Sequence, residues 1–210
     1  MALTIDSPNA DRALLTLAER RVAAGLSASD NSKDAELNAL GAYVDAMITK
    51  ACNVAQAGVI PPTLRLETVT ETFAFKSRQN GLFLARKPVV AVASVTEAGY
   101  ALADDDWELD GQGLYRVSGS VRTMWSCGAV EVTYSAGYDV VPDDLKYASI
   151  RFIQAERAQG ARDPLLKRVR IEGVSEREYW VDPTKDSVVP ADVMDILERG
   201  GFVTKWGWLR

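Results

Sequence analysis

The chain has 210 residues, of which 47% are hydrophobic and 25% charged, values typical of folded domains and far from those of disordered or collagen-like chains. It contains no histidine, and its 24 basic and 29 acidic side chains give a net charge of −5. Histidine is the commonest general base and transition-metal ligand, so its absence argues against most hydrolases and metalloenzymes. The negative net charge argues against a protein that binds nucleic acid through the phosphates.

The sequence indicates neither a membrane segment nor a disulfide framework. No apolar run approaches the roughly 20 residues that span a bilayer, and the first residues lack the basic-then-apolar order of a signal peptide. Cys52 and Cys127 are far apart and form no CxxC pair. We therefore expect reduced thiols and synthesis in the cytoplasm.

Two helices are expected in the first quarter of the chain. Ser7 can cap a helix over residues 8–24, and Gly25 can end it. A second helix is expected over residues 32–53, because two acidic residues precede apolar side chains at helical spacing. Together these segments predict a helical hairpin.

Apolar residues then recur at every second position instead of at helical spacing, and a β insertion is expected over residues 64–135. Residues 64–75 are rich in Thr and Val, and Asn80-Gly81 is typical of a tight hairpin turn. Residues 82–85 are expected to return as the partner strand. Further short strands separated by glycine turns predict an antiparallel sheet.

Helical spacing resumes in the last third of the chain. A long helix is expected over residues 142–159, packing with the N-terminal pair. Residues 169–181 alternate again, and residues 183–190 resemble a linker bounded by prolines. A short helix is expected over residues 191–199, before two glycines.

Together these elements predict an α+β fold, in which a helical bundle carries an inserted antiparallel β-sheet. Residues 1–182 are expected to form a single domain. Residues 183–210 are expected to form an extended C-terminal tail or arm that ends in the short helix.

No group of residues indicates catalysis or a cofactor. The acidic run at residues 104–106 is interpreted as a solvated turn, and Asp139, Asp143 and Asp144 as residues that favour a helix start. Gly111-Gln112-Gly113 lacks the third glycine and the following helix of a dinucleotide fingerprint. We expect no enzyme, with no catalytic, cofactor-binding or metal-binding residues and no cofactor.

Two surface features remain as candidate partner sites. A cluster of basic residues follows the long helix: Arg162, Lys167, Arg168 and Arg170. These residues either form the solvated face of a strand or bind a partner that carries phosphate or an acidic protein patch. The apolar residues of the tail either fold back on their own domain or anchor the tail in another subunit, and the linker before them favours the second interpretation. These residues are Val193, Ile196, Leu197, Trp206 and Trp208.

Three segments resemble the head-tail connector proteins of tailed phages, also called adaptor or head-completion proteins, including the adaptors of gene transfer agents. They are RKPVVAVASVTEAG at residues 86–99, VEVTYSAGYDVVPDDLKYASIRFIQAE at residues 130–156, and DPLLKRVRIEGVSEREYWV at residues 163–181. The strand that ends in YSAGY and leads into a Pro-Asp-Asp helix start is similar to that family's passage from sheet to long helix. The N-terminal helix pair fits in character but not in specific residues.

The resemblance implies a structural protein of the virion, made in a bacterial host. Its subunits would form a homo-oligomeric ring, commonly dodecameric, below the portal protein and above a stopper or tail-completion protein. From the negative charge we expect DNA to pass through the lumen without specific binding, and from the linker and apolar residues of the tail we expect the tail to bind a neighbour, the portal protein. We expect no contact with a membrane. Two alternatives stay open: a small-molecule or protein-binding module, and a hydrolase with a convergent pair of buried carboxylates.

Overall fold

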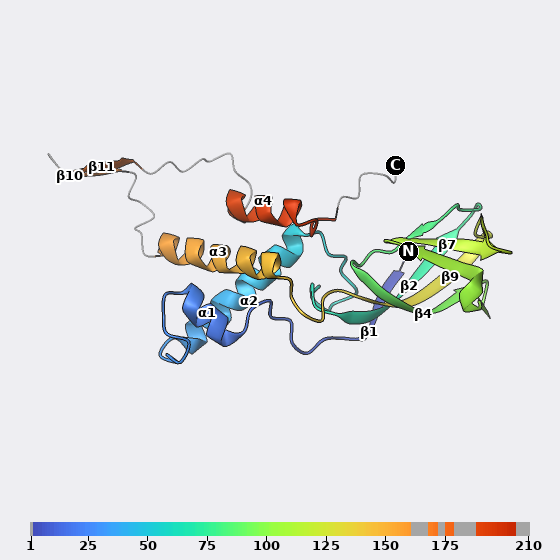
Figure 1. Cartoon of the computed structure of the whole chain (residues 1–210), viewed down its shortest axis with the longest axis horizontal. Coiled ribbons are helices and arrows are strands. Elements are labelled where there is room, and N and C mark those ends of the chain that lie inside the picture. The colour runs from blue at the N-terminus through green and yellow to red at the C-terminus, as the bar shows by residue number, and fades with distance from the viewer. Residues whose placement is uncertain (1, 161–167, 172–174, 179–187, 205–210) are drawn as a thin grey trace. The chain divides into compact units, whose positions relative to one another are not determined.

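The computed structural model describes residues 2–160, 168–171, 175–178 and 188–204 (Figure 1). The described chain divides into two compact units. The β unit takes its residues from Met1–Arg12, Cys52–Pro142 and Thr204–Arg210. The helical unit takes its residues from Ala13–Ala51 and Asp143–Val203. None of the described helices is both long and apolar enough to cross a membrane.

The β unit contains a five-stranded antiparallel sheet with the strand order β1-β2-β9-β4-β5. The strands are β1 (Ala2–Ser7), β2 (Glu67–Phe75), β9 (Gly128–Ala136), β4 (Val89–Glu97) and β5 (Tyr100–Ala101). The central pair is β2 and β9, which face each other over nine residues from Glu67 opposite Ala136 to Phe75 opposite Gly128. Alternate side chains of β2 are buried, as the period of two predicts.

A smaller sheet shares its core with the first. It consists of β3 (Leu82–Phe83), β7 (Gly113–Ser118), β6 (Trp107–Asp110) and β8 (Val121–Thr123), and a 3-10 turn, η1 (Asp104–Asp106), precedes β6. Apolar side chains from both sheets form one buried cluster around Trp125. The indole of Trp125 donates a hydrogen bond to the Leu114 carbonyl at 3.2 Å, which satisfies its buried N–H group.

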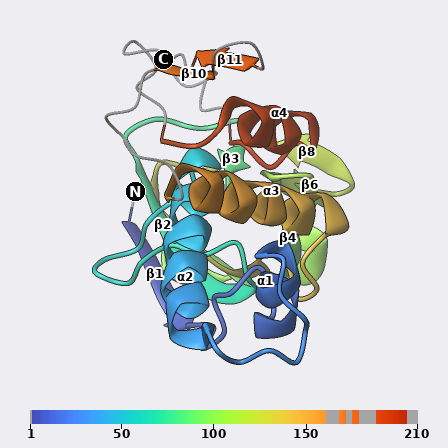
Figure 2. The same ribbon diagram turned by 90° about the vertical axis from the view of Figure 1, so that its left-hand side faces the viewer.

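The helical unit packs α1 (Leu17–Ala23), α2 (Asp34–Ala51), α3 (Asp143–Gly160) and α4 (Ala191–Arg199) (Figure 2). Here α1 contacts both α2 and α3, α2 contacts α3, and α4 lies against α3. The Nη2 atom of Arg20 on α1 lies 2.8 Å from Asp45 of α2. A Cβ atom at Gly41 would overlap with Cζ of that guanidinium, so a larger residue there would force the Arg20 side chain to move. Two short strands, β10 (Arg168–Ile171) and β11 (Ser175–Glu178), pair between α3 and α4 in sequence.

The structure confirms a mixed α+β fold and three of the expected helices. The helices predicted over residues 32–53, 142–159 and 191–199 correspond to α2, α3 and α4 within two residues at each end. The apolar face predicted for the long helix is buried at Leu145 and Phe152.

The predicted helix over residues 8–24 is wrong in its first half. Residues before Pro8 form strand β1, which pairs with β2, and helix α1 begins only after Thr16. Thr16 and Glu19 form a capping box, in which each side chain accepts a hydrogen bond from the other residue's backbone N–H. That reciprocal cap outweighs the Ser-Pro pair as a helix start.

The predicted hairpin between residues 64–75 and 82–85 is also wrong. β2 pairs with β1 and β9, whereas the short strand β3 pairs with β7. The extended C-terminal tail or arm expected over residues 183–210 differs in its described part, residues 188–204, because α4 packs on α3 within the helical unit. The division into two units likewise differs from the single domain expected over residues 1–182.

Candidate functional site

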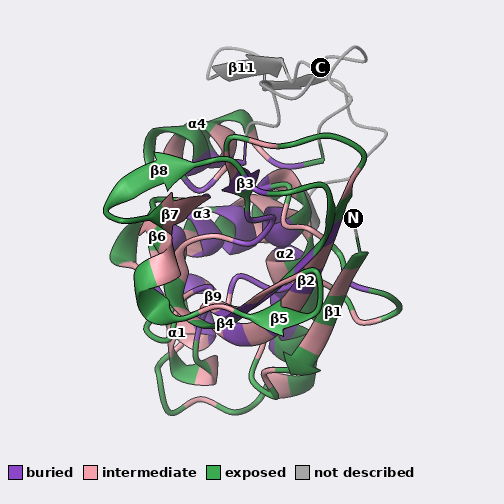
Figure 3. Cartoon of the chain, turned by 90° about the vertical axis from the view of Figure 1, so that its right-hand side faces the viewer, coloured by how far each residue is buried: buried purple, intermediate pink, exposed green. Residues whose placement is uncertain are grey.

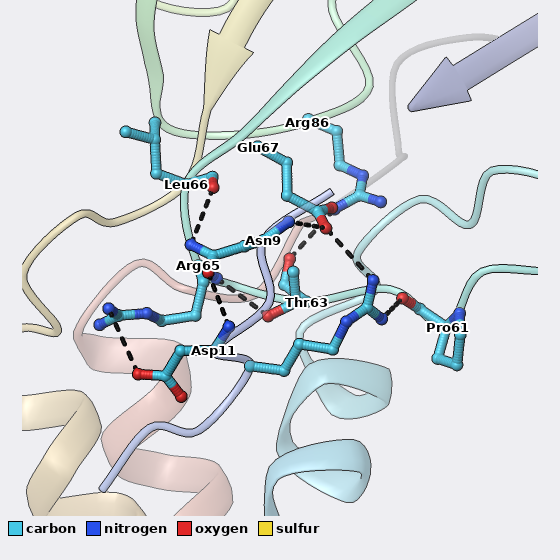
Figure 4. A network of polar contacts seen from close by, with 9 residues as sticks. Asn9, Asp11, Pro61, Thr63, Arg65, Leu66, Glu67 and Arg86 are labelled. Carbon is cyan, nitrogen blue, oxygen red and sulfur yellow. Dashed lines mark hydrogen bonds and ion pairs between the residues drawn. The ribbon is translucent and has the colours of Figure 1, made fainter. Parts of the chain in front are cut away.

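A buried polar network surrounds Glu67 at the start of β2 (Figure 4). Its Oε1 atom accepts a hydrogen bond from the backbone N–H of Asn9 at 3.2 Å and lies 3.3 Å from Nη2 of Arg12. Its Oε2 atom lies 3.4 Å from Nη1 of Arg86, which also donates to the Thr63 carbonyl at 3.0 Å. Because Glu67 and Arg86 are both buried, each stabilises the other's charge away from water.

The same network ties the segment after β1 to the segment before β2. The side-chain amide of Asn9 donates to the Leu66 carbonyl at 3.1 Å, and Arg12 donates to the Pro61 carbonyl. A longer ion pair of 3.8 Å joins Asp11 to Arg65. These contacts fix where the chain leaves the sheet.

A second buried carboxylate, Glu71, lies four residues further along β2 on the same face of the strand. Its Oε2 atom accepts hydrogen bonds from the Tyr134 hydroxyl at 2.9 Å and from the backbone N–H of Ala85 at 3.0 Å. The Tyr134 oxygen in turn accepts from the backbone N–H of Arg86 at 3.1 Å. Burial raises the pKa of Glu71 above its ordinary value of 4.5, although both hydrogen bonds act in the opposite direction.

The two buried carboxylates were missed at the level of sequence, although a signal was present. Glu67 and Glu71 share one face of β2 with Val69 and Phe73, because alternate residues of a strand point the same way. A hydrolase was expected to show a convergent pair of buried carboxylates. Here each carboxylate is held by its own donors, and these contacts fasten the segment after β3, at Ala85 and Arg86, to the sheet.

The raised pKa of Glu71 predicts a pH dependence of stability. The pKa of the Glu71 carboxyl is higher in the folded protein than in the unfolded protein. Such a carboxyl stabilises the fold at pH values below its ordinary pKa of 4.5, and the stabilisation is lost as the pH rises through the pKa of the folded protein. We expect the wild type to lose stability relative to Glu71→Gln as the pH rises from 4 to 8. Urea unfolding of both proteins across this range measures the difference. A difference that does not change with pH would contradict a raised pKa.

The other titratable candidates lie where a structural role explains them. Residues 104–106 form the turn η1, in which Asp104 and Asp105 are exposed, and the side chain of Asp106 accepts a hydrogen bond from the Ala103 backbone N–H at 3.3 Å. Asp143 and Asp144 lie in the first turn of α3. Cys52 is buried, which raises the pKa of its thiol to about 12, and Cys127 is exposed. Within the described ranges no group of metal-ligating side chains is close enough to hold a metal ion.

The tail residues fall into three classes. Val193 and Leu197 are fully buried, Ile196 is half-buried, and Trp206 and Trp208 lie outside the described residues. An ion pair of 2.8 Å between Arg151 and Asp192 also joins α3 to α4. The buried half of the apolar stripe therefore packs inside the helical unit.

The basic cluster lies largely outside the described part of the chain. Arg162 and Lys167 are not described, and Arg168 and Arg170 belong to strand β10. The contact proposed for this cluster stays a prediction.

Comparison with known proteins finds no matching family model and no matching curated protein. Among solved structures, the chain is similar to a chain in the neck of an empty gene transfer agent particle, with a TM-score of 0.58 and 20% identity over 98% of this chain and 96% of that one. A chain in the virion of a native gene transfer agent particle gives a TM-score of 0.56 and 21% identity over the same shares. A chain in the neck of a native particle, computed with C12 symmetry, gives 0.50 and 17%, again over 98% and 96%. The protein therefore has, over nearly its whole length, the fold of a chain in the neck of gene transfer agent particles, in agreement with the resemblance read from its sequence.

Proposed function

We propose that the protein is a structural head-tail adaptor subunit of a tailed phage or phage-like particle. It forms a ring that joins the portal to the stopper or tail and lets DNA pass. The observation that carries this proposal is the likeness to neck chains over 98% of the sequence. The three segments that resemble head-tail connectors support it independently, because they were identified from residues alone.

Symmetry supports a ring of twelve subunits. The similar chains belong to necks computed with C6 and with C12 symmetry, and a dodecamer is compatible with both. The net charge of −5 fits a conduit, since carboxylates on a lumen wall repel the phosphates of passing DNA. We expect passage without tight or sequence-specific binding.

The portal contact that we propose involves the tail, with different roles for its residues. Val193 and Leu197 hold α4 on α3 and so present the remaining tail, while Ile196, Trp206 and Trp208 are the residues proposed to touch the portal. Large aromatic side chains are enriched at the centres of protein interfaces. The basic cluster that includes Arg168 and Arg170 is a second proposed contact.

The test is assembly on a purified portal. Because the acidic balance disfavours unassisted association, we expect a monomer by light scattering at micromolar concentration and a ring after the cognate portal protein is added. The mass of the complex gives the number of subunits. Failure to bind the portal, or a stable ring without it, would contradict this proposal.

A further inference from the structure

The five-stranded sheet of the β unit is open at both edges. At one edge β1 pairs with β2 alone. At the other edge β5 covers β4 only at Thr96 and Glu97, and the Val95 carbonyl accepts a hydrogen bond from the Leu102 backbone N–H. Among the described residues, no strand lies beyond β1 or beyond residues 89–94 of β4. The uncovered stretches, residues 2–7 of β1 and residues 89–94 of β4, are each six residues long, and alternate residues of an edge strand point their N–H and C=O groups outward. Both strands are labelled in Figure 3.

The directions of the two edges match. Strand β1 is antiparallel to β2, β2 to β9, and β9 to β4, so β1 and β4 run in opposite directions within one sheet. A second copy whose β4 lies beside β1 in the same orientation would extend the sheet with another antiparallel pair. The antiparallel sheet can therefore continue from copy to copy.

The side chains of the two edges also match. Leu3 and Ile5 of β1 and Val89 and Val92 of β4 pack against the same buried cluster. In a continued sheet these residues would lie on the same face and join the cores of neighbouring copies, because opposite residues in an antiparallel pair share a face.

The open edge of β4 lacks charged side chains and proline, two of the usual protections of an edge strand against pairing. Its exposed residues are Val90, Ala91, Ala93 and Ser94, and residues 89–94 include no charged residue and no proline. Two register shifts bend this strand against β9, yet the charged side chains that commonly block exposed edges are missing. Such an edge is suited to a partner strand.

We infer that β1 of one subunit pairs with residues 89–94 of β4 in the next subunit, so that a continuous sheet links the ring. This inference rests on the proposed function and adds the surface through which subunits meet. Because the two edges are on opposite sides of one sheet, the contact is head-to-tail, and such contacts give a closed ring when the rotation from one copy to the next divides a full turn. A second copy is the occupant because both partners, equal in length and opposite in direction, belong to this chain.

Cysteine cross-linking in the portal-bound ring tests the pairing directly. In a Cys127→Ser background, Thr4→Cys is combined with Ala91→Cys or with Ser94→Cys. These exposed residues of β4 pair with Ser135 and Thr133 of β9 and so lie on the same face of the sheet as Thr4. Oxidation should give a ladder of dimers, trimers and larger species in one of the two double variants, and monomers in every single variant. A ring that gives no ladder with either pair, or a single variant that gives dimers, would overturn the inference.

A charge placed on the open edge gives a second, independent measurement. We expect Ala91→Lys combined with Ala93→Lys to reduce ring formation on the portal at least tenfold, while Ala74→Lys combined with Ala158→Lys, also at exposed alanines but away from both edges, leaves it unchanged. If both variants assembled equally well, edge pairing would be refuted and the proposed function would not. Absence of a ring with the wild type would instead refute the proposed function.

Discussion

Replacing Glu67 by Gln should lower the free energy of unfolding by about 3 to 5 kcal/mol, the usual cost of breaking a buried ion pair from one side. The change removes the negative charge 3.4 Å from Arg86 and leaves that buried guanidinium without a counter-charge. Arg12 is partly exposed and can turn toward water. Urea unfolding of the isolated protein measures the loss.

Two further variants separate this explanation from a general loss of packing. Adding Arg86→Met to Glu67→Gln removes the buried positive charge that would otherwise lack a counter-charge. The double variant should therefore regain more than half of the lost free energy of unfolding. The exposed pair between Glu108 and Arg122 is the control, and Glu108→Gln should lower the free energy of unfolding far less than Glu67→Gln, because water screens the exposed pair. If Glu67→Gln cost no more than this control, the buried pair would not stabilise the fold.

Replacing Leu197 by Ala should destabilise the isolated protein by about 2 to 5 kcal/mol, because its side chain is fully buried in the helical unit. The substitution leaves a cavity at the contact of α4 with the rest of that unit. Thermal and urea unfolding in the absence of any portal measure the effect.

The matched control is Val188→Ala, at an exposed residue shortly before α4, which should change stability by less than about 0.5 kcal/mol. A large loss for Leu197→Ala alone would mean that α4 belongs to the subunit's own core. Unchanged unfolding in both variants would mean that α4 is a detachable arm, as its position after a proline-bounded segment suggested.

The sequence predicts those elements whose limits are set by local chemistry. Acidic residues at the start of α2 and α3 and glycines after α4 mark helix ends that the structure reproduces. Strand β1 escaped prediction because Ser7-Pro8 offers a plausible helix start, whereas its pairing with β2 depends on residues about 65 positions away. Local signals carry no information on that contact.

Strand pairing shows the same limit. Asn80-Gly81 favours a hairpin, but β2 has nine residues that fit β9 and only two residues of β3 form a strand. The larger buried face decides the pairing. The sequence also did not predict which residues form the proposed subunit contact. A strand lies at the edge of a sheet only when no other strand pairs with its outer side, and this depends on the pairing of all the other strands.

Electron microscopy of particles from cells that lack this gene tests the central claim most directly. We predict DNA packaging without tail attachment, so that capsids bear portals but no tails, and complementation by the wild-type gene should restore complete particles. Normal tailed particles in the absence of the protein would contradict its role as a head-tail adaptor.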